Sequence, residues 1–303
     1  MKLHISKTVI IICGPTATGK TSVAIQLAKY FNIEIISADS RQCFRELNIG
    51  VARPSPEELA SVPHHFIASH SITEEVTAAV FEQYALKKTA ELFQQHDIII
   101  MVGGTGLYIK AFCEGLDTIP DIPAAIRQQV IHDYDAKGIE WLQNEIREKD
   151  PLFFQKGEIL NPQRMMRALE VVESTGRSIL SFRKGKKAKR DFNIIKIGLD
   201  LPKEELVNRI NTRVDKMMEA GLMDEVRSLS AYKNLNALQT VGYSELFAYL
   251  DGTATLDAAI ERIKINTRQY AKRQLTWFKK DEEIKWSAPG QVNKIIQRVS
   301  ESD

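Results

Sequence analysis

Cysteine is scarce in this sequence. Only Cys13, Cys43 and Cys113 occur among the 303 residues, and they are widely spaced. Three isolated cysteines give neither a disulfide framework nor the paired spacing of a zinc knuckle. We therefore expect a protein of a reducing compartment, without a structural zinc site of this kind.

Long apolar runs are also absent. The longest, 9–13 and 97–102, have the length of buried strands, whereas a helix needs ~20 apolar residues to cross a bilayer. The run near the N-terminus is too short for the apolar part of a signal peptide. The sequence therefore predicts no membrane partner.

Neither sign of charge is in excess. Lys and Arg number 41 and Asp and Glu 39, which gives a formal net charge of +2. A polyanionic partner would therefore have to be bound by local basic patches. The length is about twice that of a usual domain, which predicts two domains or one large domain with an insertion.

Short β-branched runs alternate with helical periodicity over most of the chain. The predicted strands cover 7–13, 33–38, 97–102, 193–201 and, as a further candidate, 283–286. Helices are predicted at 20–31 and 74–95. Alternating strands and helices indicate an α/β fold with a parallel sheet and right-handed crossovers.

Between about 120 and 190 the periodicity is helical and no buried strand is evident. Asn161-Pro162 is typical of a helix start, and Gly176 is typical of the end of that helix. The pattern predicts a core formed by residues 1–119 and 191–303, which carries an inserted all-helical domain over 120–190.

Residues 14–21 match the phosphate-loop pattern G-x-x-x-x-G-K-[ST] between a predicted strand and a predicted helix. The loop reads Gly14, Pro15, Thr16, Ala17, Thr18, Gly19, Lys20 and Thr21. Its backbone N–H groups and the helix N-terminus suit phosphate oxygens, Lys20 supplies a cation and the Thr21 hydroxyl a ligand for Mg²⁺. The pattern predicts a bound di- or triphosphate with Mg²⁺ and does not single out ATP. No acid ends the 97–102 strand, which disfavours a motor or switch ATPase.

Two further segments follow predicted strands at the same edge of the sheet, where ligands of open α/β folds bind. Asp39 has the chemistry of a general base, but Asp39 or Ser40 could equally cap the next helix. Gly103 and Gly104 allow either a close approach to a ligand or a tight turn before a helix, and Thr105 offers a hydroxyl. The spacing leaves both alternatives open for each segment.

Basic residues gather in a few places. Residues 262–280 hold seven cations and no acid, with Tyr270, Trp277 and Phe278 interleaved, and residues 183–190 hold six cations in eight positions. Either segment suits an RNA backbone, and either could be a solvated surface. Arg209 and Arg213 are four residues apart, which fits a phosphate contact or a plain surface pair.

Six stretches occur together in this chain. They read Gly14-Pro-Thr-Ala-Thr-Gly-Lys-Thr21, Ile36-Ser-Ala-Asp-Ser40, Val102-Gly-Gly-Thr-Gly-Leu-Tyr108, Asn161-Pro-Gln-Arg164 with Arg167-Ala-Leu-Glu170, Val241-Gly-Tyr243, and Lys272-Arg-Gln-Leu-Thr-Trp277. In this combination and order the chain resembles the tRNA dimethylallyltransferase family, also called tRNA isopentenyltransferases. The phosphate loop alone is generic, whereas the combination is specific.

The resemblance implies a P-loop kinase-like core with a helical insertion domain. It also implies transfer of a dimethylallyl group from dimethylallyl diphosphate to the N6 amine of adenosine 37 of tRNA, with release of pyrophosphate. By this resemblance Asp39 is the base, residues 14–21 hold the diphosphate, and Arg213 matches the family's phosphate-binding arginine. Lys20 and Thr21 complete the expected catalytic set, with Thr21 as the ligand of Mg²⁺.

The resemblance also implies which segments contact the anticodon stem-loop of the tRNA partner. They comprise Asp39, Ser40, Arg41, Gln42, Thr105, Arg127, Gln163, Arg164, Met165, Met166, Arg167, Gln239, Thr240, Val241, Gly242, Tyr243, Ser244, Lys272, Arg273, Gln274, Leu275, Thr276, Trp277, Phe278 and Lys279. Gln239 and Ser244 stand where some relatives carry arginine, so the contacts of that stretch differ from the family's pattern.

The expected enzyme is of the bacterial type, because no zinc-finger extension follows Trp286. We expect it to be a cytoplasmic monomer. The alternative is a small-molecule P-loop kinase in which Asp39 activates a hydroxyl and the insertion acts as a lid. That alternative leaves the acid-free stretch 262–280 without a role.

Overall fold

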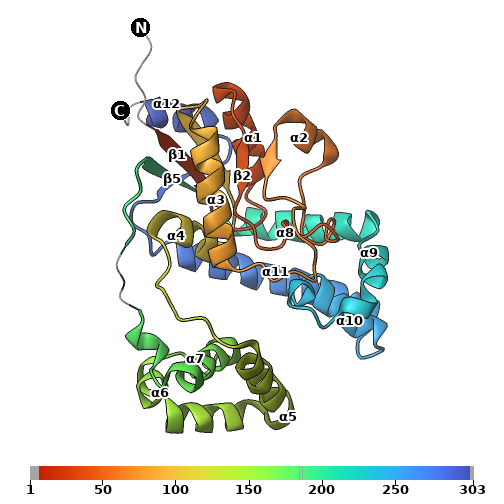
Figure 1. Cartoon of the computed structure of the whole chain (residues 1–303). Coiled ribbons are helices and arrows are strands. Elements are labelled where there is room, and N and C mark those ends of the chain that lie inside the picture. The colour runs from red at the N-terminus through yellow and green to blue at the C-terminus, as the bar shows by residue number, and fades with distance from the viewer. Residues whose placement is uncertain (1–6, 184, 186, 301–303) are drawn as a thin grey trace. The chain divides into compact units, whose positions relative to one another are not determined.

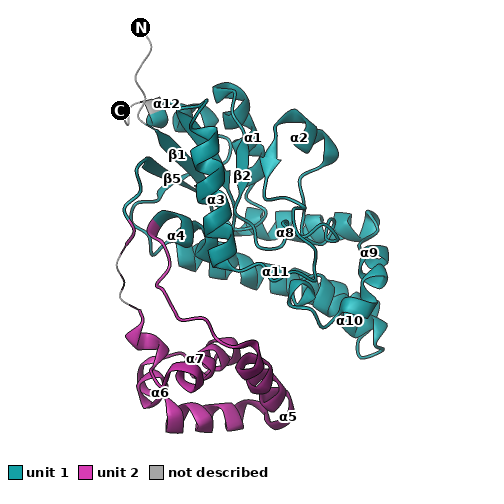
Figure 2. Ribbon diagram, in the orientation of Figure 1, with its two compact units in different colours: residues 1–113, 189–303 teal, residues 114–188 magenta. Residues whose placement is uncertain are grey.

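The chain folds into two compact units, of residues 1–113 with 189–303 and of residues 114–188 (Figure 2). The computed structural model describes residues 7–183, 185 and 187–300. Lys184 and Lys186 of the basic 183–190 segment lie outside the described residues. The division falls at 113/114 and 188/189, where the sequence predicts 119/120 and 190/191.

The first unit is an α/β core (Figure 1). Before the insertion it contains β1 (Thr8–Cys13), α1 (Lys20–Phe31), β2 (Ile35–Ser37), α2 (Pro56–Ser61), β3 (His64–His65), α3 (Ala78–Leu92), β4 (Ile98–Val102) and α4 (Gly106–Glu114). After the insertion it contains β5 (Asn193–Leu199), α8 (Lys203–Glu219), α9 (Leu222–Ser228), η2 (Ser230–Tyr232), η3 (Asn236–Leu238), α10 (Tyr243–Leu250), α11 (Leu256–Phe278), β6 (Lys285–Ser287) and α12 (Val292–Ser300).

The six strands form one parallel sheet in the order β3-β2-β4-β1-β5-β6. Alternate residues of the strands enter two different hydrophobic cores, because successive side chains of a strand point to opposite faces. Ile10 and Ile12 pack on the face covered by α1 and α12, whereas Val9 and Ile11 pack on the face that includes α3 and α4. Burial on both faces explains why these strands read as continuous apolar runs.

The predicted α/β fold with a parallel sheet and inserted helices is confirmed. The helix predicted at 20–31 has those bounds, and the helix predicted at 74–95 is shorter because Thr77 caps its start by accepting a hydrogen bond from Val80 N–H at 3.3 Å. The sequence reading missed α2 and the two-residue strand β3.

The second unit contains helices joined by loops and no strand among its described residues. It contains α5 (Ala124–Lys149), α6 (Pro151–Lys156), α7 (Pro162–Thr175) and η1 (Ile179–Ser181), and α5 is broken at Gly138, whose φ is 76°. Its core includes Leu142, Phe153 and Met165. Among the described residues no helix combines the length and the apolar character needed to cross a membrane.

Gly103, at the end of β4, brings two backbone segments into close contact. A Cβ at this position would lie 2.1 Å from the carbonyl oxygen of Ala38. We predict that Gly103→Ala lowers the free energy of unfolding by about 1–3 kcal/mol, the usual cost of overpacking. Urea unfolding measures this.

Gly290→Ala is the matched control for that substitution. A Cβ at Gly290 would meet nothing within 4 Å, so this variant should unfold like the wild type. Equal stabilities of the two variants would contradict the close packing of β4 on Ala38.

Candidate active site

The phosphate loop connects the central strand β1 to α1. Gly14 and Gly19 adopt positive φ values of 132° and 86°, and Ala17 does so at 65° despite its side chain. No side chain caps the N-terminus of α1. The first N–H groups of α1 therefore remain available to an anion, and the helix dipole favours negative charge there.

Two cations contact this loop. Lys20 Nζ donates a hydrogen bond to the Pro15 carbonyl at 2.7 Å, and Arg213 of α8 donates one to Thr16 Oγ1 at 3.1 Å. Burial and the nearby Arg213 guanidinium lower the pKa of Lys20 to about 8. Burial also lowers the pKa of Arg213. Both shifts have the physical cause expected of a cationic pocket from which water is partly excluded.

Gln274 of α11 braces the loop from the other side. Its Oε1 accepts a hydrogen bond from Thr16 N–H at 2.8 Å, and its Nε2 donates to the Gly104 carbonyl at 2.9 Å. Gln274 is buried. Its amide joins the phosphate loop to the residue pair after β4, and its expected contact with tRNA stays a prediction.

Asp39 lies in a tight turn after β2. Its Oδ1 accepts hydrogen bonds from Arg41 N–H at 2.9 Å and from Gln42 N–H at 3.2 Å. Thr105 Oγ1 accepts a hydrogen bond from Ser40 N–H at 3.0 Å. Asp39 therefore caps a turn and not a helix, because the next helix, α2, begins only at Pro56, and these hydrogen bonds fix the orientation of the Asp39 carboxylate.

A cavity of about 380 Å³ contains the predicted catalytic set. Lys20, Thr21, Asp39 and Arg213 all line it, together with Gln274 and with Tyr270, which sequence reasoning did not assign to this site. Among the described residues no group of three or more His, Cys, Asp or Glu side chains is placed to hold a metal ion. A cation here would therefore depend on Thr21, Asp39 and the oxygens of a bound anion.

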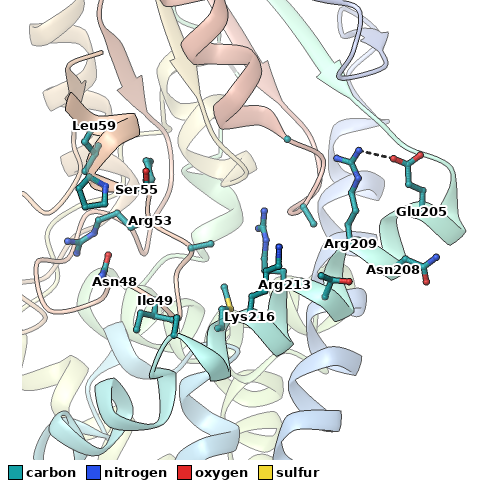
Figure 3. Close-up of a pocket in the computed structure, with 18 of the residues that line it drawn as sticks. Asn48, Ile49, Arg53, Ser55, Leu59, Glu205, Asn208, Arg209, Arg213 and Lys216 are labelled. Atoms are coloured by element: carbon teal, nitrogen blue, oxygen red, sulfur yellow. Dashed lines mark ion pairs between the residues drawn. The ribbon is translucent and has the colours of Figure 1, made fainter. Parts of the chain in front are cut away.

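A second, larger cavity of about 1430 Å³ lies beside the first (Figure 3). The two share Ala17, Gly19, Ala52, Arg53, Pro54 and Arg213. Figure 3 shows Asn48, Ile49 and Arg53 on one side of it, and Arg209, Arg213 and Lys216 of α8 on the other. The two arginines, which the sequence could not distinguish, have different partners. Arg209 forms an ion pair with Glu205 at 2.8 Å, whereas Arg213 contacts the phosphate loop at Thr16.

The segments predicted to contact tRNA divide into exposed and buried side chains. In α11, Lys272, Arg273, Thr276 and Trp277 are exposed, and so is Lys279 directly after the helix. So are Gln239 and Ser244, while Ser40, Arg41, Gln42, Thr105, Thr240, Val241 and Leu275 are half-buried. These residues lie in the α/β unit, and their contacts with RNA remain predictions.

Several other members of that set are packing residues, and their expected contacts with tRNA stay predictions. Tyr243, Phe278 and Met165 are at most 2% exposed, and Met166 and Gly242 are also buried. The side chains of Tyr243, Phe278 and the two methionines point into the hydrophobic cores because they occupy the inward faces of α10, α11 and α7.

The helical unit holds the remaining predicted contacts. Arg127, Gln163 and Arg164 are exposed and Arg167 is half-buried. Both arginines of α7 form ion pairs, Arg164 with Glu158 and Arg167 with Glu170, the latter at 3.0 Å. An RNA phosphate would have to replace those carboxylates.

The geometry can now be set beside known proteins. A family model described as IPP transferase matches residues 42–281. The chain belongs to the IPP transferase family.

Curated relatives in this family agree over nearly the full length. The tRNA dimethylallyltransferase of Flavobacterium johnsoniae is 49% identical over 303 residues, covering 98% of each chain. That of Cytophaga hutchinsonii is 47% identical over 291 residues, covering 96% of each. The resemblance found in the sequence is confirmed.

Solved structures of the IPP transferase family share the fold. The tRNA isopentenylpyrophosphate transferase of Bacillus halodurans superposes with a TM-score of 0.71 at 34% identity, covering 98% of each chain. A eukaryotic dimethylallyltransferase acting on tRNA gives a TM-score of 0.74 at 28% identity, covering 90% of this chain and 70% of that one.

The lowered pKa of Lys20 should make anion binding by this member of the IPP transferase family depend on pH. Above pH 8, approximately the pKa of Lys20 in the free protein, Lys20 loses its proton and with it the charge that attracts an anion. Binding must then take up a proton, so we predict that the affinity for inorganic pyrophosphate falls by up to about tenfold per pH unit.

Calorimetric titration of the wild type and of Lys20→Ala from about pH 7 to about pH 9 tests this. The variant should bind more weakly and keep only the pH dependence of pyrophosphate itself. Parallel curves for the two proteins would show that Lys20 is not the titrating group.

Proposed function

We propose that this chain transfers the dimethylallyl group of dimethylallyl diphosphate to the N6 amine of adenosine 37 of tRNA and releases pyrophosphate. Membership of the family makes the chain a transferase that prenylates tRNA. The donor, the acceptor position and the roles of individual residues are the proposal. One observation carries it: Lys20 and Arg213 share a single cavity with the Asp39 carboxylate.

The phosphate loop would hold the diphosphate of the donor. As the allylic C–O bond breaks, negative charge grows on the departing pyrophosphate and positive character on the allylic carbon. Lys20 and Arg213 line the cavity beside the uncapped N-terminus of α1, and together they would stabilise that negative charge. In other proteins a phosphate loop binds the phosphates during phosphoryl transfer. Here it would bind the pyrophosphate leaving group while the amine attacks carbon instead of phosphorus.

Magnesium fits the oxygen donors of this cavity. Mg²⁺ prefers hard oxygen ligands and is often held by one or two side chains plus substrate phosphates. The Thr21 hydroxyl and the Asp39 carboxylate both line the cavity. When bound, Mg²⁺ would neutralise charge on the diphosphate, which is the role we propose for it through Thr21.

Asp39 is the proposed general base. The N6 amine of adenine is a weak nucleophile because its lone pair is delocalised into the ring. A carboxylate that accepts its proton as the N–C bond forms makes the attack easier. The turn of residues 39–42 fixes this carboxylate in the lining of the smaller cavity. The adenine must leave the stack of the anticodon loop to reach it.

The exposed face of α11 is the proposed contact for the tRNA backbone. Lys272 and Arg273 are exposed there and Lys279 is exposed directly after the helix, and the Arg273 guanidinium lies 5.9 Å from the centre of the Tyr270 ring. Cations with adjoining aromatic faces suit a phosphate backbone with unstacked bases. A monomer working in the cytoplasm remains part of the proposal.

A small-molecule kinase is the alternative, and the relatives disfavour it because they are named for dimethylallyl transfer to tRNA. Incubation with unmodified tRNA and dimethylallyl diphosphate, followed by mass spectrometry of the nucleosides, tests the proposal. Adenosine carrying one dimethylallyl group is expected at position 37. Phosphoryl transfer from ATP to a small molecule, with no prenylated nucleoside, would overturn the proposal.

Asp39→Asn retains the size of the side chain but removes its basicity. We predict a fall of about 10²–10⁴ in the single-turnover rate at saturating donor and tRNA, the usual contribution of general acid–base catalysis. Affinities for both substrates should change far less. A rate within a few-fold of the wild type would leave Asp39 with only its turn-capping role.

Lys272→Ala should weaken tRNA binding and make it less sensitive to salt. The slope of log affinity against log salt should fall by roughly one unit for one lost phosphate contact. Lys285→Ala removes an exposed lysine of β6 outside this stretch and serves as the control. An unchanged slope for Lys272→Ala would make α11 a solvated surface.

A further inference from the structure

One short segment forms part of the wall of both cavities. Ala52 and Arg53 line both of them, Asn48 and Ile49 line only the larger one, and Val51 lines only the smaller one. We call residues 48–53 the cavity wall. Figure 3 shows Asn48, Ile49 and Arg53 of this wall beside the larger cavity. Its shape therefore affects the space around the phosphate loop and around Asp39.

A carboxylate from a distant helix holds one end of this wall. Glu225 of α9 accepts a hydrogen bond from Ile49 N–H through Oε2 at 2.8 Å and one from Gly50 N–H through Oε1 at 3.1 Å. Tyr243 of α10 donates its hydroxyl proton to Glu225 Oε1 at 2.5 Å. Hydrogen bonds to a carboxylate are stronger than those between neutral groups.

The wall also packs closely on the Tyr243 ring. A Cβ added at Gly50 would lie 2.5 Å from a ring carbon of Tyr243. Tyr243 is buried, and burial together with Glu225 raises the pKa of its hydroxyl. It therefore remains a hydrogen-bond donor to Glu225.

The other end of the wall is tied to the Asp39 turn. Gln42 Nε2 donates to the carbonyls of Val51 at 3.2 Å and of Ala52 at 2.9 Å, while Gln42 N–H donates to Asp39 Oδ1. Ala52 has a φ of 49°. Such a left-handed conformation costs energy for a residue with a side chain and persists only where the surroundings enforce it.

We propose that Glu225 is a positioning residue for prenyl transfer, which holds the cavity wall and, through Gln42, the Asp39 turn in their reactive arrangement. The inference rests on the proposed function. Among the described residues that line the two cavities Glu225 is absent, so it acts through the wall and not on the substrate. It also links Tyr243 of α10 to the residues around Asp39.

Glu225→Ala and Glu225→Gln test this, with Asp224→Ala as the control. Asp224 lies beside Glu225 on α9, but it is exposed and pairs with Arg227. We expect the single-turnover rate at saturating donor and tRNA to fall about ten- to a hundredfold in Glu225→Ala, because small misplacements of reacting groups are costly. The rate of Glu225→Gln should lie between those of Glu225→Ala and the wild type. The tRNA affinity of both Glu225 variants and the rate of Asp224→Ala should stay within about twofold of the wild-type values.

The single-turnover rate is divided by the amount of bound donor. Unfolded protein, which binds no donor, therefore does not lower the measured rate. A purely structural role would lower the melting temperature and leave this rate at the wild-type value in both Glu225 variants, which would overturn the proposal. Where Glu225→Ala does not fold, Glu225→Gln and Tyr243→Phe decide in the same way.

Gln42→Ala combined with Glu225→Gln adds a second readout. Since both residues hold one wall, their effects on the rate should be less than additive. Fully additive effects would separate the two residues and contradict the network. Failure of the wild-type protein to prenylate tRNA would instead refute the proposed function itself. The incubation with unmodified tRNA and dimethylallyl diphosphate distinguishes that outcome.

Discussion

The Gln274 amide joins the two loops from which the site is built. It receives the N–H of Thr16 and donates to the carbonyl of Gly104, and these partners are 258 and 170 residues away in sequence. A buried polar group that loses its partner costs far more than an exposed one. The conformation of the phosphate loop is therefore coupled to the packing of α11 against the sheet edge.

Arg213 adds a second long-range constraint on the same loop. It reaches Thr16 from α8, which follows the helical insertion in the chain. Residues before the insertion supply the phosphate loop and Asp39, and residues after it supply Arg213 and Gln274. The cavity is complete only when both parts of the core have folded together, although each part alone contains recognisable motifs.

The parts of the fold that the sequence predicts well are local ones. The β-branched run of β1, the glycine that ends it and the helical spacing of α1 all lie within 25 residues, so periodicity alone locates the loop. The capping box of α2, from Ser55 to Glu58, is an equally local signal, but the sequence analysis did not use it and missed this helix. By contrast β3 has two residues, and no periodicity can reveal a strand of that length.

The spacing of residues in the sequence does not reveal contacts between segments that are distant along the chain. Gly103 and Gly104 are small because Ala38 and Gln274 approach them, whereas the sequence allowed a ligand or a turn to be the reason. Tyr243 stands in a stretch that resembles an RNA contact, yet its hydroxyl and ring serve Glu225 and Gly50. A motif identifies residues that matter, and only the packed structure tells which of them touch protein.

The central claim is that the leaving diphosphate and the acceptor amine meet in the cavity between Lys20 and Asp39. A crystal structure with an unreactive thio-diphosphate analogue of the donor and an anticodon stem-loop tests it directly. The account predicts the diphosphate on residues 14–21 and the flipped adenine N6 within hydrogen-bond reach of the Asp39 carboxylate, about 2.6–3.2 Å. A diphosphate bound elsewhere, or an adenine amine distant from Asp39, would contradict it.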